Sequence, residues 1–196
     1  MKKNIRDLLR GNPVIPGIKD DRGLQSVLSA ENKLVFILYG TIVNIGEIVG
    51  SLKDAGKTVF VNVDLLEGGG GRGIILDFLR QNSDTDGILS SKAGLVKAAK
   101  NLGFYTIHRF FLIDSFSFKS MDKQIKMSEP DCLEILPGWP KLVSWTLDKL
   151  DYPLIAGGLI CFEEDMKAAL DAGANSISTT NENLWPGKGR SRPKNR

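Results

Sequence analysis

Two glycines and three hydroxyl residues near the end of the chain have the types and spacing of a phosphate-binding site. Gly157 and Gly158 end one apolar segment, and the next apolar segment runs into Ser178, Thr179 and Thr180. Glycine has no Cβ atom, so its backbone N–H can approach an anion closely, and the hydroxyl groups supply further donors. The sequence therefore predicts a site for a small phosphorylated molecule.

Four charged residues inside otherwise apolar segments form a second candidate set: Lys19, Asp64, Arg109 and Glu134. Burying a charge costs free energy unless the group is paired or faces a solvated site. We expect these side chains to line the cavity beside the phosphate. The pattern leaves an alternative open for each of them, namely a salt bridge inside the fold or a loop position that faces water.

The elements that must position these residues alternate along the whole chain. Eight apolar segments have the continuous pattern of parallel strands covered on both faces. They lie at 14–19, 34–40, 58–66, 86–91, 105–114, 132–138, 153–159 and 175–180. Segments between them have helical spacing of apolar residues, most clearly at 43–56, 92–103 and 162–172. This alternation predicts the α/β class and a single-domain (β/α)8 TIM-type barrel, in which the last two strands commonly hold a phosphate.

Composition narrows the class of protein further. The chain has 196 residues, of which 42% are hydrophobic and 25% charged, as in an ordinary soluble domain. No apolar run reaches the roughly 18–20 residues that span a bilayer, and the first residues lack a secretory signal, so we expect a cytoplasmic protein. Cys132 and Cys161 stand in apolar contexts without metal-ligand spacing, which predicts buried reduced thiols, no metal and no cofactor.

The end of the chain is strongly basic. It contains no acidic residue and five basic ones, which are Lys188, Arg190, Arg192, Lys194 and Arg196. Without these five, the chain has 21 basic and 23 acidic residues. We therefore expect a barrel domain over 1–187 and a basic, disordered tail over 188–196. The tail would either contact RNA phosphates or simply add solubility, and both interpretations stay open.

The glycine run at 68–73, GGGGRG, matches the dinucleotide fingerprint GxGxxG in form. Four consecutive glycines satisfy almost any such pattern, and the run follows the third expected strand rather than the first of a βαβ unit. We therefore favour a lid beside the barrel mouth, with Arg72 available to an anion. Its role stays open.

Aromatic residues and the one histidine carry weaker signals. We expect His108 to be a satisfied interior group, and Phe110 and Phe111 to be core residues. The remaining aromatic cluster shows no spacing typical of an RNA-binding module, and we interpret it as packing and a candidate homodimer surface. Its members are Phe116, Phe118, Trp139, Trp145 and Trp185.

Several blocks of the sequence together resemble the bacterial glycerol uptake operon antiterminator family. The most specific are RFFLIDS at 109–115, LEILPG at 133–138 and IAGGLI at 155–160, supported by IPGIKD at 15–20 and VFILYGTI at 35–42. The resemblance extends over about 13–185. Similar proteins respond to glycerol 3-phosphate and act on leader mRNA to prevent premature transcription termination of glycerol-utilisation genes.

The resemblance implies a role for each candidate residue. The two glycines and the three hydroxyl residues would hold the phosphate of glycerol 3-phosphate, and the four charged residues would surround its glycerol part. RNA binding by the tail is our own inference, because the tail lies beyond the shared blocks. An enzyme is the alternative from another class, an isomerase or lyase of phosphosugars with a Schiff base at Lys92 or Lys19.

Overall fold

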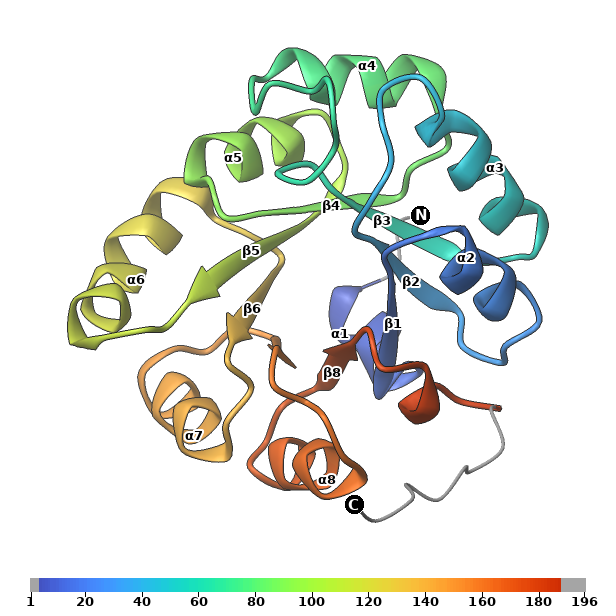
Figure 1. Cartoon of the computed structure of the whole chain (residues 1–196). Helices are drawn as coiled ribbons and strands as arrows, with labels where there is room; N and C mark the ends of the chain where they lie inside the picture. Colours follow the sequence, from blue (N-terminus) through green and yellow to red (C-terminus); the bar gives the residue numbers. More distant parts are fainter. Residues whose placement is uncertain (1–3, 188–196) are drawn as a thin grey trace.

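The computed structural model describes residues 4–187, which form one closed barrel of eight parallel strands (Figure 1). Each strand pairs with its neighbours in chain order, and β1 closes the barrel against β8. The strands are β1 Val14–Ile18, β2 Leu34–Ile37, β3 Thr58–Asn62, β4 Gly87–Ser90, β5 Tyr105–Phe111, β6 Cys132–Leu136, β7 Leu154–Gly157 and β8 Ser176–Thr179. The prediction of a (β/α)8 barrel is confirmed. The basic residues predicted to form the tail lie outside the described residues.

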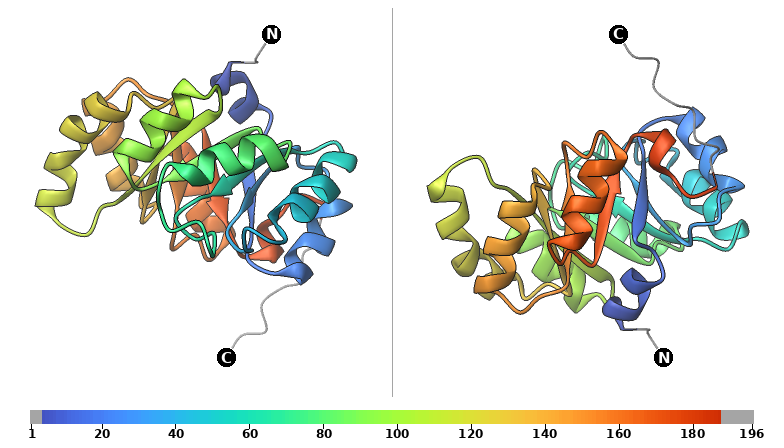
Figure 2. Two further views of the ribbon diagram at one scale, coloured as in Figure 1. Left: turned by 90° about the horizontal axis from the view of Figure 1, so that it is seen from above. Right: turned by 90° about the horizontal axis from the view of Figure 1, so that it is seen from below.

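One helix precedes β1, and one helix follows each of the strands β1 to β7. They are α1 Ile5–Arg10, α2 Asp21–Leu28, α3 Ile45–Asp54, α4 Ile74–Asn82, α5 Ala93–Asn101, α6 Ser115–Ser128, α7 Pro140–Lys149 and α8 Glu163–Asp171. A short 3₁₀ helix, η1 Glu182–Leu184, follows β8. α1 and η1 lie at opposite ends of the barrel (Figure 2). Among the described residues no helix has both the length and the apolarity to cross a membrane.

Apolar side chains fill the inside of the barrel. Alternate residues of each strand point inward, and Phe36, Phe60 and Leu89 belong to a buried cluster that Leu9 of α1 joins. The rings of Phe36 and Phe60 stack with their centroids 5.9 Å apart. Because α1 and this cluster close one end, a ligand can enter only at the opposite end, where the strands finish.

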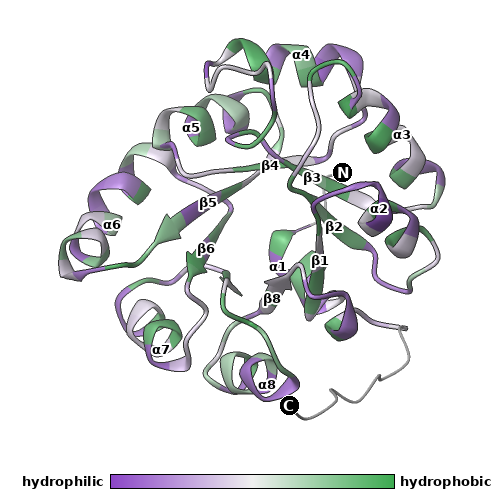
Figure 3. Cartoon of the chain, viewed as in Figure 1, coloured by the Kyte–Doolittle hydropathy of each residue, from purple (hydrophilic) through white to green (hydrophobic). Residues whose placement is uncertain are grey.

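Two further apolar clusters lie between the strands and the helices. The strands are mainly hydrophobic in colour, while the helices carry both hydrophobic and hydrophilic colours (Figure 3). This is the expected pattern when strands are buried on both faces and helices on one. The charged residues at the strand ends therefore lie next to an interior that is otherwise apolar.

Three expectations about local structure are wrong. β3 ends at Asn62 rather than near residue 66, because the Asn62 side chain accepts a hydrogen bond from the Asp64 N–H at 3.0 Å and starts a turn. Phe111 is 52% exposed. It shares the inward face of β5 with Arg109 but lies one layer higher, above the end of the packed interior. Cys161 is exposed because it lies in the loop after β7, whereas Cys132 is buried in the barrel.

Gly87→Ala should destabilise the barrel, because a Cβ at this position would lie 2.8 Å from atoms of both Phe60 and Tyr105. We expect a loss of about 1–3 kcal/mol in the free energy of unfolding, as for other overpacked sites. Gly50→Ala is the control, since Gly50 lies within α3 with no atom within 4 Å of an added Cβ. It should raise stability by about 0.5–1 kcal/mol. Urea unfolding measures both; equal stability of the Gly87 variant and the parent chain would contradict the packing argument.

Candidate functional site

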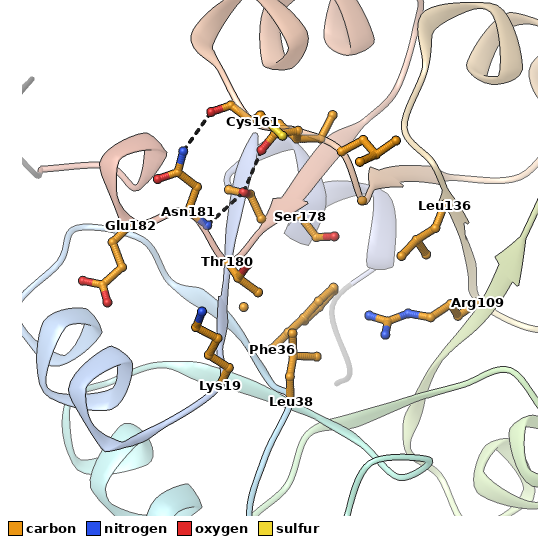
Figure 4. Close-up of a pocket in the computed structure, with 15 residues that line it drawn as sticks. Lys19, Phe36, Leu38, Arg109, Leu136, Cys161, Ser178, Thr180, Asn181 and Glu182 are labelled. Atoms are coloured by element: carbon orange, nitrogen blue, oxygen red, sulfur yellow. Dashed lines mark hydrogen bonds between the residues drawn. The ribbon is translucent and has the colours of Figure 1, made fainter. Parts of the chain in front are cut away.

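A cavity of about 560 Å³ opens at the end of the barrel where the strands finish (Figure 4). Its walls come from the ends of β1, β2, β5, β6 and β8 and from the loop that joins β7 to α8. The volume is in the range of small-molecule sites. Phe36 and Leu38 form an apolar wall, and polar groups converge from the other strands.

A buried ion pair forms the base of this cavity. The Nε atom of Arg109 donates to Glu134 Oε2 at 2.6 Å, and the Ser178 hydroxyl donates to Glu134 Oε1 at 2.6 Å. Glu134 is fully buried. Both of its oxygens are therefore satisfied, as a buried carboxylate requires.

Arg109 keeps most of its hydrogen-bonding capacity for the cavity. A guanidinium has five N–H donors, and only the Nε donor reaches Glu134. The terminal nitrogens of Arg109 have no hydrogen-bond acceptor among residues 4–187, and they project into the cavity (Figure 4). Glu134 thus fixes the orientation of a cationic donor fork that suits an oxygen-rich ligand.

Gly157 makes room for this arrangement rather than lining the cavity. A Cβ at Gly157 would lie 2.5 Å from the Ser178 hydroxyl oxygen and 3.0 Å from Glu134 Oε1. Any side chain here would therefore displace the hydrogen bond between those two residues.

The loop after β7 is held in place from β8. The Thr179 hydroxyl donates to the Ile160 carbonyl at 3.1 Å, and the Asn181 amide donates to the Cys161 carbonyl at 2.8 Å (Figure 4). The buried Trp185 indole in turn donates to the Thr179 carbonyl at 3.0 Å. The hydroxyl of Thr179 thus holds the loop in its conformation. The position of the loop is set without a ligand.

The loop after β7 and the end of β8 present backbone N–H donors that have no hydrogen-bond partner. Gly158 has φ +67° and Leu159 φ +55°, a conformation that a leucine adopts only at a cost. Within the described part of the chain, no acceptor receives the backbone N–H of Leu159, Ile160 or Thr180. All three residues line the cavity. Free N–H groups on glycine-containing loops are typical of anion sites.

Lys19 adds a positive charge on the opposite wall. It directly follows β1 and is exposed, and its ammonium group points toward Thr180 and Asn181 (Figure 4). No described acidic group lies within salt-bridge distance of Lys19. The cavity therefore combines one free ammonium, one guanidinium and a row of backbone donors, and its lining includes one acidic residue, Glu182.

Asp64 lies apart from the cavity and caps the neighbouring loop. Its carboxylate accepts hydrogen bonds from the Ser90 hydroxyl at 2.7 Å, the Ser91 hydroxyl at 2.8 Å and the Ser91 N–H at 2.6 Å. Lys92 follows this loop, and a Cβ on Gly71 would overlap its ammonium nitrogen. The glycine run at 68–73 thus packs against Lys92, and Arg72 is not among the residues that line the cavity.

The structure thus sorts the predicted site residues into three groups. Those that line the cavity are Lys19, Arg109, Gly158, Ser178, Thr179 and Thr180. Glu134 and Gly157 lie beneath it, and Asp64 is separate. Sequence reasoning missed Cys161 and Asn181, although each directly follows a segment that it had singled out. No cluster of His, Cys, Asp or Glu able to hold a metal ion occurs among residues 4–187.

Comparisons with known proteins agree on one relationship. Residues 14–185 match the family model described as glycerol-3-phosphate responsive antiterminator. The protein YgcP of Escherichia coli is 48% identical over 179 residues, which cover 91% of this chain and 94% of YgcP.

Two solved structures are similar in fold and sequence. A glycerol uptake operon antiterminator regulatory protein from Listeria monocytogenes has a TM-score of 0.86 and 30% identity, covering 90% of this chain and 96% of that one. A glycerol uptake operon antiterminator-related protein from Thermotoga maritima has a TM-score of 0.77 and 30% identity, covering 88% and 96%.

The buried surroundings of His108 predict how its imidazole group titrates. His108 is fully buried, its Nδ1 lies 2.8 Å from the Ser128 hydroxyl, and burial lowers its pKa to about 4. An unfolded chain binds a proton near the ordinary value of about 6.5. Between these two values the unfolded state holds more protons, so stability should fall as the pH falls from about 6.5 to 4.

Because the chain has one histidine, a single imidazole signal reports this titration by NMR. We expect a midpoint near 4 for the folded protein. The same chain in concentrated urea is the control and should titrate near about 6.5. A folded-state midpoint equal to the urea value would show that His108 is not buried as described.

Proposed function

Because the chain belongs to the glycerol-3-phosphate responsive antiterminator family, we propose that it senses glycerol 3-phosphate at the barrel mouth and acts on leader mRNA of glycerol-utilisation genes. The observation that carries this proposal is the cavity whose donors and positive charges match a small phosphate ester. A role on nascent transcripts implies a cytoplasmic protein.

The phosphate group would occupy the side of the cavity between β1 and the loop after β7. There the unpartnered N–H groups of Leu159, Ile160 and Thr180 would donate to its oxygens. Lys19 would balance the charge from the other wall. Gly158 would let the phosphate approach the backbone, in agreement with the role that the sequence predicts for it.

The glycerol part would extend toward Arg109 and Ser178. The free guanidinium nitrogens would donate to its hydroxyl oxygens, and the apolar wall of Phe36 and Leu38 would contact its carbon atoms. Asp64 cannot take part in this pose without giving up its bonds to Ser90 and Ser91. We therefore propose Arg109, Ser178 and the buried Glu134 as the glycerol end of the site.

Sensing without turnover fits the chemistry of the cavity. Proton abstraction needs a base within reach of the ligand, yet Glu134 already accepts from Arg109 and Ser178 with both oxygens. His108 is fully buried and bonded to Ser128. Neither group is placed as a free general base, which, together with the match to a regulatory family, supports our proposal that glycerol 3-phosphate is an effector rather than a substrate.

Glycerol 3-phosphate should stabilise the protein in thermal unfolding, whereas glycerol at the same concentration should not. At one hundred times the Kd, linkage predicts about 2.7 kcal/mol of added stability. Gly158→Ala should weaken this effect, because a Cβ at φ +67° adds strain and would lie 3.1 Å from Leu136 at the cavity wall.

Gly103→Ala is the matched control for that variant. Gly103 also has a positive φ, +85°, but lies in open space after α5, outside the cavity. Both variants should lose stability from backbone strain, and only the Gly158 variant should lose glycerol 3-phosphate affinity, measured by calorimetry. Equal affinities of the two variants would refute the proposed phosphate position.

We also propose that the basic residues at 188–196 contact phosphates of the leader mRNA. Deleting 188–196 removes five positive charges. The slope of log affinity against log salt should become shallower by about 3.5, since each single-strand phosphate contact contributes roughly 0.7. Glycerol 3-phosphate affinity should be unchanged. An unchanged salt slope would leave the segment with a solubilising role only.

A further inference from the structure

The helices α6 and α7 carry many lysines. Together they carry five lysines and two aspartates, whereas α8 has four acidic residues and one lysine. The five lysines are Lys119, Lys123, Lys126, Lys141 and Lys149. The two helices α6 and α7 therefore carry a net positive charge next to the acidic helix α8.

Exposed aromatic rings lie on the same two helices. Phe116 is 78% exposed at the start of α6, Trp139 is 55% exposed just before α7, and Trp145 is 47% exposed within α7. Single exposed apolar residues are ordinary, but a row of large rings on two neighbouring helices is typical of a binding surface.

These rings and lysines lie on the two helices that border a groove. α6 packs against α5 and stands away from α7 (Figure 1). Side chains bridge the space, since the rings of Phe118 and Trp145 have centroids 6.1 Å apart and Lys149 Nζ lies 3.0 Å from Asp122 Oδ2. At the C-terminal ends of the two helices the groove contains a hollow of about 490 Å³, lined by Lys126 and Lys149, by the acidic residues Asp122 and Glu129, and by Tyr152.

Cations already lie over the aromatic faces in this groove. Lys141 Nζ is 5.0 Å from the centre of the Trp145 ring, and Lys149 Nζ is 5.1 Å from that of Phe118. Lys119, Lys123 and Lys126 have no ion-pair partner among the described residues. The combination of free ammonium groups with exposed aromatic rings is the chemistry that binds single-stranded nucleic acid.

We infer that single-stranded RNA binds in the groove between α6 and α7, an inference that rests on the proposed antiterminator function. Lysines on α6 contact its phosphates, and Phe116, Trp139 and Trp145 stack on its bases. A second copy of the chain fits this surface less well. A two-fold dimer would place the lysines of one protomer against those of the other, and like charges repel.

Backbone hydrogen bonds connect the groove to the cavity. The Leu112 N–H, just before α6, donates to the Leu136 carbonyl at 2.7 Å, and the Gly138 N–H, just before α7, donates to the Gly158 carbonyl at 3.0 Å. Leu136 and Gly158 both line the cavity. Glycerol 3-phosphate and RNA therefore share the segments that position Phe116 and Trp139, and each ligand should change the affinity of the other by the same factor.

The test measures binding of a fluorescein-labelled, 40-nucleotide RNA pool of random sequence to the full chain by anisotropy at several salt concentrations. Lys119→Gln/Lys123→Gln should make the salt slope shallower by about 1.4. Phe116→Ala/Trp145→Ala should lower affinity by about tenfold or more through lost stacking. The control, Lys33→Gln/Lys167→Gln, removes two exposed charges elsewhere and should leave the slope unchanged.

Equal salt slopes for the two lysine variants would overturn the inference. So would an aromatic variant that binds RNA normally but changes from dimer to monomer in sedimentation, since the groove would then be a contact between copies. Glycerol 3-phosphate affinity of every variant, measured by calorimetry, checks folding. If the parent chain binds glycerol 3-phosphate but no RNA, the RNA part of the proposed function fails with the inference. If it binds RNA in the groove but not glycerol 3-phosphate, the inference stands and the proposed effector fails.

Discussion

The ion pair between Arg109 and Glu134 sets the character of the whole barrel mouth. Two charges buried at the end of an apolar interior are tolerated only when each is hydrogen-bonded, and removing one partner of such a pair typically costs about 3–5 kcal/mol. Ser178 satisfies the second oxygen of Glu134, and Gly157 leaves the space that this bond needs. One carboxylate thereby fixes three strands relative to one another, and the guanidinium that it orients faces the cavity.

Preorganisation extends from this pair to the backbone. The loop after β7 takes its shape from hydrogen bonds to Thr179 and Asn181, so its donors are ordered before any anion arrives. Ordering a loop on binding would cost affinity, and a loop that is already ordered avoids that cost. The left-handed conformation of Leu159 fits this account, because surrounding bonds hold a strained residue at the place where an anion would lie.

The sequence predicts the architecture well, because continuous apolar strands and amphipathic helices follow directly from burial on two faces or one. It also identifies part of the cavity, since Lys19, Gly158 and Thr180 each stand at a strand end. It could not sort the charged residues by role. Asp64 and Glu134 have the same local pattern, and only the register of their neighbours decides that one caps a serine loop while the other lies beneath the cavity. The exposure of Phe111 likewise depends on β5 continuing above the packed interior, which no local pattern shows.

The closure of β1 against β8 has a consequence for the synthesis of the protein. Lys19 follows the first strand and Thr180 follows the last, so the two walls of the proposed phosphate site are synthesised at the start and the end of translation. A chain still on the ribosome, with residues 176–187 inside the exit tunnel, has the lysine but neither Thr180 nor the bonds that shape the loop after β7. The proposed effector site is therefore complete only after β8 has left the tunnel, and a product that lacks β8 would lack one wall of that site.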